Sequence, residues 1–376
     1  MILKVISAII YGKDYFQKTL VLMRYNIAGV KAMKKITGTN LIKRWENDTV
    51  WKCRWEHMVS WLFGKNEENN WLNELEYTSD GYWDLRGFSI NFDVDFKKYT
   101  DRKKEDLMKD SRNLISNKEF EKIDFSFADF TGRYIKNCKF YNCIFNNTIM
   151  CDITESQSEF VDCVFKRGIY GGTLGLGGGK YKNVQFQSVK MHRTQMFWPD
   201  FEDCLFQNCN LNGTDFGGSH FKNVKFVGDI KNVWFRGKLE ASKSGRYWES
   251  KYERWNRILP MEVDFSEASL RYIAVSDFCD LSKVILPKDG SCYLIPDMER
   301  MRDDIRKRQS EKNTKLLDIF LKFHLRKMEG EKMGILCLND VYKQIEKYID
   351  QEDWKKNFYM CREICEDLTK QGILEL

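Results

Sequence analysis

The sequence FEKIDFSFADFTGRYIKNCKFYNCIF at residues 120–145 carries a large apolar residue at every fifth position. The same spacing continues, with an interruption at Glu155, as far as Tyr170, and it resumes in a shifted register from Tyr181 to Phe226. A period of five fits neither an α-helix, whose period is 3.6, nor a β-strand, whose period is two. The repeat therefore indicates a chain that turns a corner every five residues.

The residue two places before each large apolar one is usually small, as at Ala128, Cys138, Cys143, Thr148 and Cys163. If each five-residue side turns a corner, these residues and the large ones point inward together. They must alternate in size to fill a narrow interior at normal packing density. The 12 cysteines are therefore better explained as small, apolar, reduced residues than as a disulfide framework.

This pattern resembles the pentapeptide-repeat family, whose signature is a small residue, Asp or Asn, Leu or Phe, and two variable residues. Examples here are Ala128-Asp129-Phe130 and Thr214-Asp215-Phe216. The resemblance covers residues 118–240 and 263–286 and, more faintly, Trp83–Phe96. It implies a right-handed quadrilateral β-helix with four pentapeptides in each turn.

Three places depart from the pattern. Glu155 stands where a large apolar residue belongs and Arg133 where a small one belongs, so either the register shifts or their polar groups point outward at a distorted corner. The stretch Gly171–Gly179 adds one residue to the spacing, which predicts a bulge. It is not a phosphate-binding loop, because Gly179-Lys180 is followed by Tyr181 and not by Ser or Thr.

We expect an α+β protein with three parts: a helical N-terminal domain (1–80), a pentapeptide-repeat β-helix (81–290) and a helical C-terminal domain (291–376). Excursions at 97–119 and 237–262 should interrupt the β-helix. The apolar start Met1–Ile10 is too short to span a bilayer and predicts a buried helix, so no membrane is expected.

The last part, from Asn339 to Leu376, has the helix–helix–short strand order of a winged helix. Its final helix carries Glu363, Glu366 and Asp367, which suit a phosphate backbone badly. A helical interaction module is the favoured interpretation, and a nucleic-acid-dependent regulator is an alternative.

The sequence nominates no catalytic residue, metal ligand set or cofactor, so an enzyme is not expected. Cys361 and Cys365 lie one helical turn apart, but no other His or Cys has the spacing of further ligands, which favours buried residues. His192 and His220 should face outward, and a pairing of His220 with an outward Asp stays open.

The candidate partner-binding residues lie in an aromatic and basic stripe and at one further tryptophan that we expect to be exposed. They are Trp248, Tyr252, Trp255, Arg246, Arg254 and Trp198. Basic residues among aromatic ones at helical spacing can bind a partner or nucleic acid. The alternative is that the aromatic residues pack against the rod while the basic residues are solvated.

The favoured function is a non-enzymatic, cytoplasmic scaffold, of a kind found in bacteria, that binds a protein partner through the faces and excursions of the rod. The family resemblance implies an alternative, protection of a type II topoisomerase by DNA mimicry. Such mimics have acidic rods, whereas this chain has a net charge of +6. Homo-oligomers are a further alternative if a rod end is left uncovered.

Overall fold

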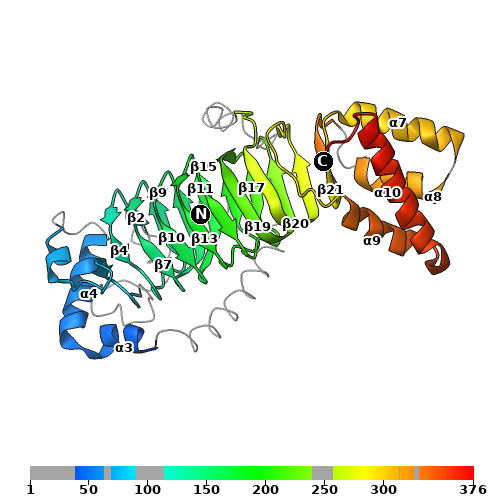
Figure 1. Cartoon of the computed structure of the whole chain (residues 1–376). Coiled ribbons are helices and arrows are strands. Elements are labelled where there is room, and N and C mark those ends of the chain that lie inside the picture. Colours follow the sequence, from blue (N-terminus) through cyan, green and yellow to red (C-terminus); the bar gives the residue numbers. More distant parts are fainter. Residues whose placement is uncertain (1–38, 63–68, 90–113, 239–256, 313, 326–329) are drawn as a thin grey trace, which may run out of the picture.

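The structure, a computed structural model, describes residues 39–62, 69–89, 114–238, 257–312, 314–325 and 330–376. Parallel β-strands form a rod, with helices at each of its ends (Figure 1). The apolar segment Met1–Ile10 lies outside the described residues. The expected α+β architecture with a central β-helix is confirmed.

One turn of the rod takes four five-residue sides, because Phe145 pairs with Phe165 on the strand stacked on it. Side 1 is made by β1 (Trp83–Asp84), β4 (Ile123–Asp124), β7 (Ile144–Asn146), β10 (Val164–Lys166), β13 (Gln185–Gln187) and β16 (Leu205–Gln207). Side 3 is made by β2 (Leu114–Ser116), β5 (Tyr134–Lys136), β14 (Gln195–Phe197) and β17 (Asp215–Gly217).

Side 4 is a separate 6-stranded sheet of β3 (Glu119–Glu121), β6 (Lys139–Tyr141), β9 (Glu159–Val161), β12 (Lys180–Lys182), β15 (Asp200–Glu202) and β18 (His220–Lys222). Side 2 includes single bridges such as Lys190 to Asn210. Four longer strands run round corners: β8 (Ile149–Ser156), β11 (Ile169–Leu176), β19 (Val224–Arg236) and β20 (Val263–Ser276).

The large apolar residues fill the rod, as expected. Phe140 stacks on Phe160 with ring centroids 4.6 Å apart, and Phe145 stacks on Phe165 at 4.4 Å. Each side chain is buried. Burying one such ring contributes about 1.5–3 kcal/mol, so the repeat is the main source of the rod's stability.

The small inward residues also form hydrogen bonds, which the sequence analysis did not anticipate when it described them as apolar. The Cys163 thiol donates to the carbonyl of Phe140 at 3.3 Å, and the Thr148 hydroxyl donates to the carbonyl of Phe125 at 2.8 Å. Cysteine and threonine therefore tie each coil to the one before it.

The corners have a distinctive backbone. The residue two places after a central apolar residue commonly has a positive φ, as at Asn142, Asn147, Asp162, Asn183 and Asn208. Asn, Asp and Gly tolerate this left-handed region better than other residues. The five-residue period thus reflects a corner conformation as well as an inward face.

At the N-terminal end, α3 (Thr39–Asn47), α4 (Thr49–Leu62) and the 3-10 helix η1 (Asn69–Glu74) cover the first coils. The Trp45 ring meets Phe88 edge to face at 5.4 Å, and its indole N–H donates to the carbonyl of Arg86 at 2.9 Å. Trp61 meets Phe120 in the same way at 5.5 Å. Buried tryptophans therefore close this end of the apolar interior.

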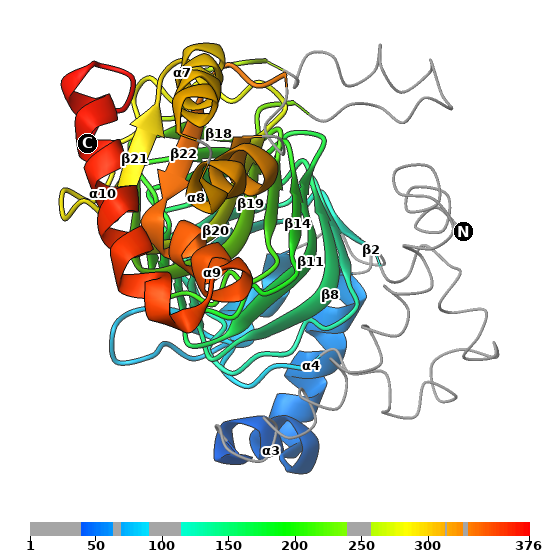
Figure 2. The same ribbon diagram turned by 90° about the vertical axis from the view of Figure 1, so that its right-hand side faces the viewer.

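The C-terminal domain lies over the other end (Figure 2). Its described residues form the antiparallel pair β21 (Cys292–Ile295) and β22 (Gly334–Cys337) and six helical elements. These are α7 (Met298–Glu311), α8 (Lys315–Ile319) with the π-helix η5 (Phe320–Leu325), α9 (Leu338–Tyr348), the 3-10 helix η7 (Gln351–Asp353) and α10 (Trp354–Lys370).

The strand pair was not expected in a domain predicted to be helical. Cys292 and Leu294 pack with the rod's core, whereas Tyr293 and Ile295 pack with the helices. Because both faces are buried, the strand sequences CYLI and GILC show no alternation, and periodicity cannot separate them from helix.

Strand pairing resumes before the predicted end of each excursion. Leu114 already pairs with Tyr134, so the rod resumes before Glu119. After the second excursion, Pro260 forms a bridge with Asp280.

Candidate protein-binding surface

Two aromatic residues stand at corners of the last coil, where most other coils have Asn, Asp, Gly or another polar residue. Tyr272 has φ 53° and Phe278 has φ 65°. Their side chains are 41% and 46% exposed. A bulky residue in the left-handed region is strained, and an exposed ring gains nothing from burial. Both costs fall on the same two residues.

The backbone at these corners is held by carboxylates of the C-terminal domain. In inner coils a corner N–H donates to a carbonyl of the next coil, as from Gly213 to Asn232 at 2.7 Å. In the last coil, Tyr272 N–H donates to both carboxylate oxygens of Asp340 at 2.8 and 3.0 Å. Asp277 and Phe278 donate to the two oxygens of Glu331 at 2.7 and 3.0 Å.

Other apolar side chains are exposed around these corners. Six of the eleven large apolar side chains exposed in the described part of the chain lie between residues 234 and 285. We define the corner aromatic surface as Trp234, Tyr272, Phe278, Ile258 and Leu259. Lys238 lies over the Phe278 ring at 5.9 Å. Lys238 and Arg257 are the described residues on either side of segment 239–256, which falls within the second predicted excursion.

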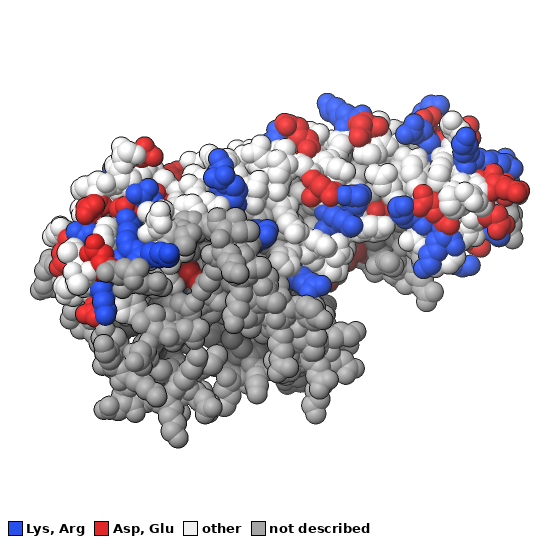
Figure 3. Space-filling model, turned by 90° about the horizontal axis from the view of Figure 1, so that it is seen from below, with Lys and Arg blue, Asp and Glu red and all other residues white. Residues whose placement is uncertain are grey.

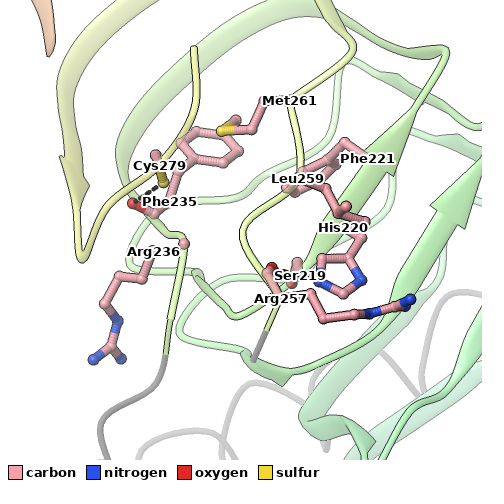
Figure 4. Close-up of a pocket in the computed structure, with 10 residues that line it drawn as sticks. Ser219, His220, Phe221, Phe235, Arg236, Arg257, Leu259, Met261 and Cys279 are labelled. Carbon is pink, nitrogen blue, oxygen red and sulfur yellow. Dashed lines mark hydrogen bonds between the residues drawn. The ribbon is translucent and has the colours of Figure 1, made fainter. Parts of the chain in front are cut away.

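A pocket of about 270 Å³, including open solvent, lies beside this surface, where the chain returns to the rod. Ser219, His220 and Arg257 line one wall, and Phe235 and Cys279 line another (Figure 4). Ser219 is 7% exposed, and its hydroxyl has no hydrogen-bond partner within the described residues. The pocket therefore has polar and charged side chains on one part of its lining and apolar side chains on the rest, and the Ser219 hydroxyl is a buried polar atom in it.

His220 faces outward and pairs with Asp200 at 2.7 Å from Nδ1, which confirms a pairing that the sequence left open. Its Nε2 lies 3.0 Å from the carbonyl of Arg257. This histidine fastens the returning chain to side 4.

Of the predicted partner-binding residues, only Trp198 lies within the described part of the chain. Trp248, Tyr252, Trp255, Arg246 and Arg254 lie outside the described residues. Trp198, which we expected to be exposed, is only 9% exposed and packs with Phe197 and Leu176. Its outward position in the repeat does not make it accessible, because Phe197 and Leu176 lie beside it. Tyr272 and Phe278 were not among the residues predicted from the sequence, although aromatic residues at corner positions are a signal that could have found them.

Charges on side 4 alternate from strand to strand. Each residue pairs in register with one of opposite sign in the series Glu119, Lys139, Glu159, Lys180 and Asp200. A neighbouring row places Glu202 between Lys182 at 3.6 Å and Lys222 at 2.7 Å. Basic and acidic groups are also interspersed on the face seen in Figure 3. Side 4 therefore shows no continuous row of one sign along this register.

Glu155 points into the rod, so neither alternative from the sequence applies to it. It is fully buried, and its carboxylate accepts hydrogen bonds from Ser158 N–H at 2.9 Å, Gly175 N–H at 2.6 Å and Tyr181 hydroxyl at 2.9 Å. Burial raises the pKa of Glu155, and these donors partly offset that rise. The glutamate takes the place of a large apolar residue in order to hold the glycine-rich stretch.

The glycine-rich stretch changes the register three times. Compared with the preceding coil, the pairing loses one residue before Gly172, gains one before Leu176 and gains another before Lys180. The stretch is therefore one residue longer than the coil on which it stacks. A Cβ at Gly172 would lie 2.1 Å from the carbonyl oxygen of Ile153. The predicted bulge is therefore confirmed, and Gly172 is required by close backbone contact.

All 12 cysteines are free, and eleven are buried. Cys361 and Cys365 are buried against each other, and this contact raises the pKa of Cys361. No group of three or more His, Cys, Asp or Glu suited to a metal ion occurs among the described residues. The Sγ atom of the exposed Cys53 lies 4.0 Å from Nε2 of His57. The other ring nitrogen of His57, Nδ1, lies 3.0 Å from a carboxylate oxygen of Glu74.

Parallel coils with four five-residue sides define a repeat protein of the β-solenoid class. A family model described as pentapeptide repeats (8 copies) matches residues 200–228. The matched residues run from β15 into β19, and the coils before them repeat the same four-sided geometry. None of the described helices is long and apolar enough to cross a membrane.

Several solved structures resemble the chain. HetL of the cyanobacterium Nostoc sp. strain PCC 7120, a pentapeptide-repeat protein involved in heterocyst differentiation regulation, is 13% identical, with TM-score 0.26, over 46% of this chain and 87% of that one. Full-length QnrB1, a plasmid-mediated fluoroquinolone resistance protein, is 14% identical, with TM-score 0.20, over 51% and 91%. No curated protein shows significant sequence similarity.

Proposed function

We propose that this chain is a non-enzymatic intracellular scaffold that binds a protein partner through the corner aromatic surface of its last coils. The observation that carries the proposal is the placement of Tyr272 and Phe278 at exposed left-handed corners. A left-handed conformation costs an ordinary residue about 1–2 kcal/mol. The left-handed conformation recurs at corners throughout the rod, so what distinguishes these two corners is the exposed aromatic ring at each.

The kind of partner follows from the side chains. Exposed aromatic residues are enriched at the centres of protein interfaces, where they supply much of the binding free energy. Trp234, Ile258 and Leu259 extend the apolar area around the two corners. The stripe Trp248, Tyr252 and Trp255, with Arg246 and Arg254, stays a prediction from the sequence, because it lies outside the described residues. Trp198 is left out because it is buried.

Protection of a topoisomerase by DNA mimicry is a weaker candidate. A mimic requires a continuous negative face, whereas side 4 alternates in sign from Glu119 to Asp200. Nucleic-acid binding is likewise less favoured, since phosphate backbones are bound through clustered Lys and Arg.

The test is an affinity pull-down from cell lysate with the full chain, scored for protein and nucleic acid. The double variant Tyr272→Asn/Phe278→Asn removes both rings while keeping residues that tolerate the corner. The matched control is Arg167→Asn, which changes a corner of φ 58° on an inner coil. We expect a specific protein to be recovered by the wild type and the control, and lost with the double variant.

Other outcomes redirect the proposal. An unchanged set of proteins with the double variant would overturn the corner aromatic surface, and Trp248→Ala/Tyr252→Ala/Trp255→Ala would then test the excursion. Recovery of a topoisomerase would place DNA mimicry first. Recovery of nucleic acid with affinity that falls steeply with salt would favour the nucleic-acid alternative.

A further inference from the structure

The contact between Cys292 and Cys337 lies at the junction between the rod and the C-terminal domain. Their sulfur atoms are 3.1 Å apart, and both side chains are buried. They stand directly opposite each other on β21 and β22, and both belong to the apolar core that includes the rod's interior. Forty-five positions separate them in the sequence.

The strand geometry suits a covalent bond. Leu338 N–H donates to the carbonyl of Ser291 at 2.8 Å, so residues 291 and 338 form a hydrogen-bonded pair. Cys292 and Cys337, one step further in, therefore form a non-hydrogen-bonded pair, whose Cα atoms approach to about 4.5 Å. This lies within the range of about 4.4–6.8 Å that disulfides require.

We propose that Cys292 and Cys337 are a redox-modification site, at which a small-molecule disulfide such as oxidised glutathione converts the two thiols into a cross-strand disulfide. The Cys292 thiolate attacks one sulfur of the reagent, forms a mixed disulfide and releases one glutathione thiol. The Cys337 thiolate then attacks the sulfur of Cys292 and releases the second. Two protein thiols are oxidised, and one glutathione disulfide is reduced to two thiols.

The surroundings make this reaction dependent on the position of the C-terminal domain. Contact with Cys292, together with burial, raises the pKa of Cys337 well above its usual range, so the closed pair reacts slowly. The pair becomes accessible when the strand pair lifts from the rod. Glu331 and Asp340, which hold the last coil's N–H groups, oppose that movement. The disulfide would fasten β21 to β22 and stabilise the covered end.

The experiment uses the full chain carrying Cys53→Ser, because Cys53 is the exposed thiol and would form mixed or intermolecular disulfides. After incubation with oxidised glutathione, we expect nine of its eleven thiols to remain, with a peptide linking residues 292 and 337. The thermal midpoint should rise by several degrees and return on reduction. Addition of Glu331→Ala should speed oxidation several-fold.

Two controls make the result decisive. Adding Cys337→Ser should prevent any intramolecular disulfide, and Cys292→Ser serves the same purpose should the first variant fold poorly. Eleven thiols that remain free after prolonged oxidation would overturn the proposal. So would a linked peptide that joins Cys361 to Cys365, or a disulfide at 292 and 337 that leaves the thermal midpoint unchanged.

Discussion

The two ends of the rod are closed by different chemistry. At the N-terminal end, the tryptophans Trp45 and Trp61 lie edge-on against the aromatic rings of the first coils. At the C-terminal end, the strand pair β21–β22 covers the interior, and Asp340 and Glu331 accept the N–H groups of the last corners. A solenoid must cover the apolar side chains at its ends and must also provide hydrogen-bond partners for the backbone groups there. The N-terminal end shows the first requirement most clearly, and the C-terminal end shows the second.

The largest expected effect is at the N-terminal end. Trp45→Ala should lower the free energy of unfolding by about 3–5 kcal/mol, because it removes a buried ring and leaves a cavity over Phe88. Trp234→Ala, which removes an exposed ring near the other end, should change stability by no more than about 0.5 kcal/mol. Denaturant unfolding measures both variants, and equal losses would contradict an apolar closure at the N-terminal end.

The C-terminal end should respond to loss of its carboxylates. Glu331→Ala or Asp340→Ala should each cost about 1.5–3 kcal/mol, because N–H groups of the last coil lose charged acceptors. Hydrogen exchange should show faster exchange at Tyr272, Asp277 and Phe278 N–H groups. Glu363→Ala, at an exposed position on α10, is the control and should leave these rates unchanged.

Glu155 is a carboxylate that accepts backbone N–H groups inside the rod, whereas Asp340 and Glu331 do so at its end. Its burial should make the stability of the protein depend on pH. Its folded pKa is raised above the ordinary value of 4.5, so the folded state binds more protons than the unfolded state above that pH. Stability should therefore be higher at about pH 4.5 and fall as the pH rises through the folded pKa. Unfolding measured between acid and neutral pH should show this fall in the wild type and lose it in Glu155→Met. A slope that persists in Glu155→Met would assign the fall to other groups.

The smallest expected effect is at the corner aromatics, and its sign is opposite. Tyr272→Asn and Phe278→Asn should each raise the free energy of unfolding by up to about 1 kcal/mol, because Asn tolerates the left-handed corner better. Arg167→Asn should give a similar gain without affecting binding. A marked loss of stability on removing the rings would mean that they serve the fold and not a partner.

The inward half of the rod could be predicted from the sequence, and the outward half could not. The position of Phe145 or Cys163 within the five-residue repeat decides that it points inward, because every side repeats the same turn. The same repeat places Trp198 and Phe278 on equivalent corners, yet one is buried and the other exposed. Exposure depends on which other segments lie over a corner, and the local pattern carries no information about that.

What the sequence determined alone is the architecture: a five-residue spacing of large apolar residues with small partners admits a four-sided coil and excludes helix and ordinary strand. The tertiary structure decided everything that joins distant segments. It placed Glu155 under Gly175, brought Cys292 opposite Cys337, and set Glu331 against Phe278. These contacts lie far apart in the chain, and only the stacking of coils and the docking of the C-terminal domain bring their atoms within hydrogen-bonding distance.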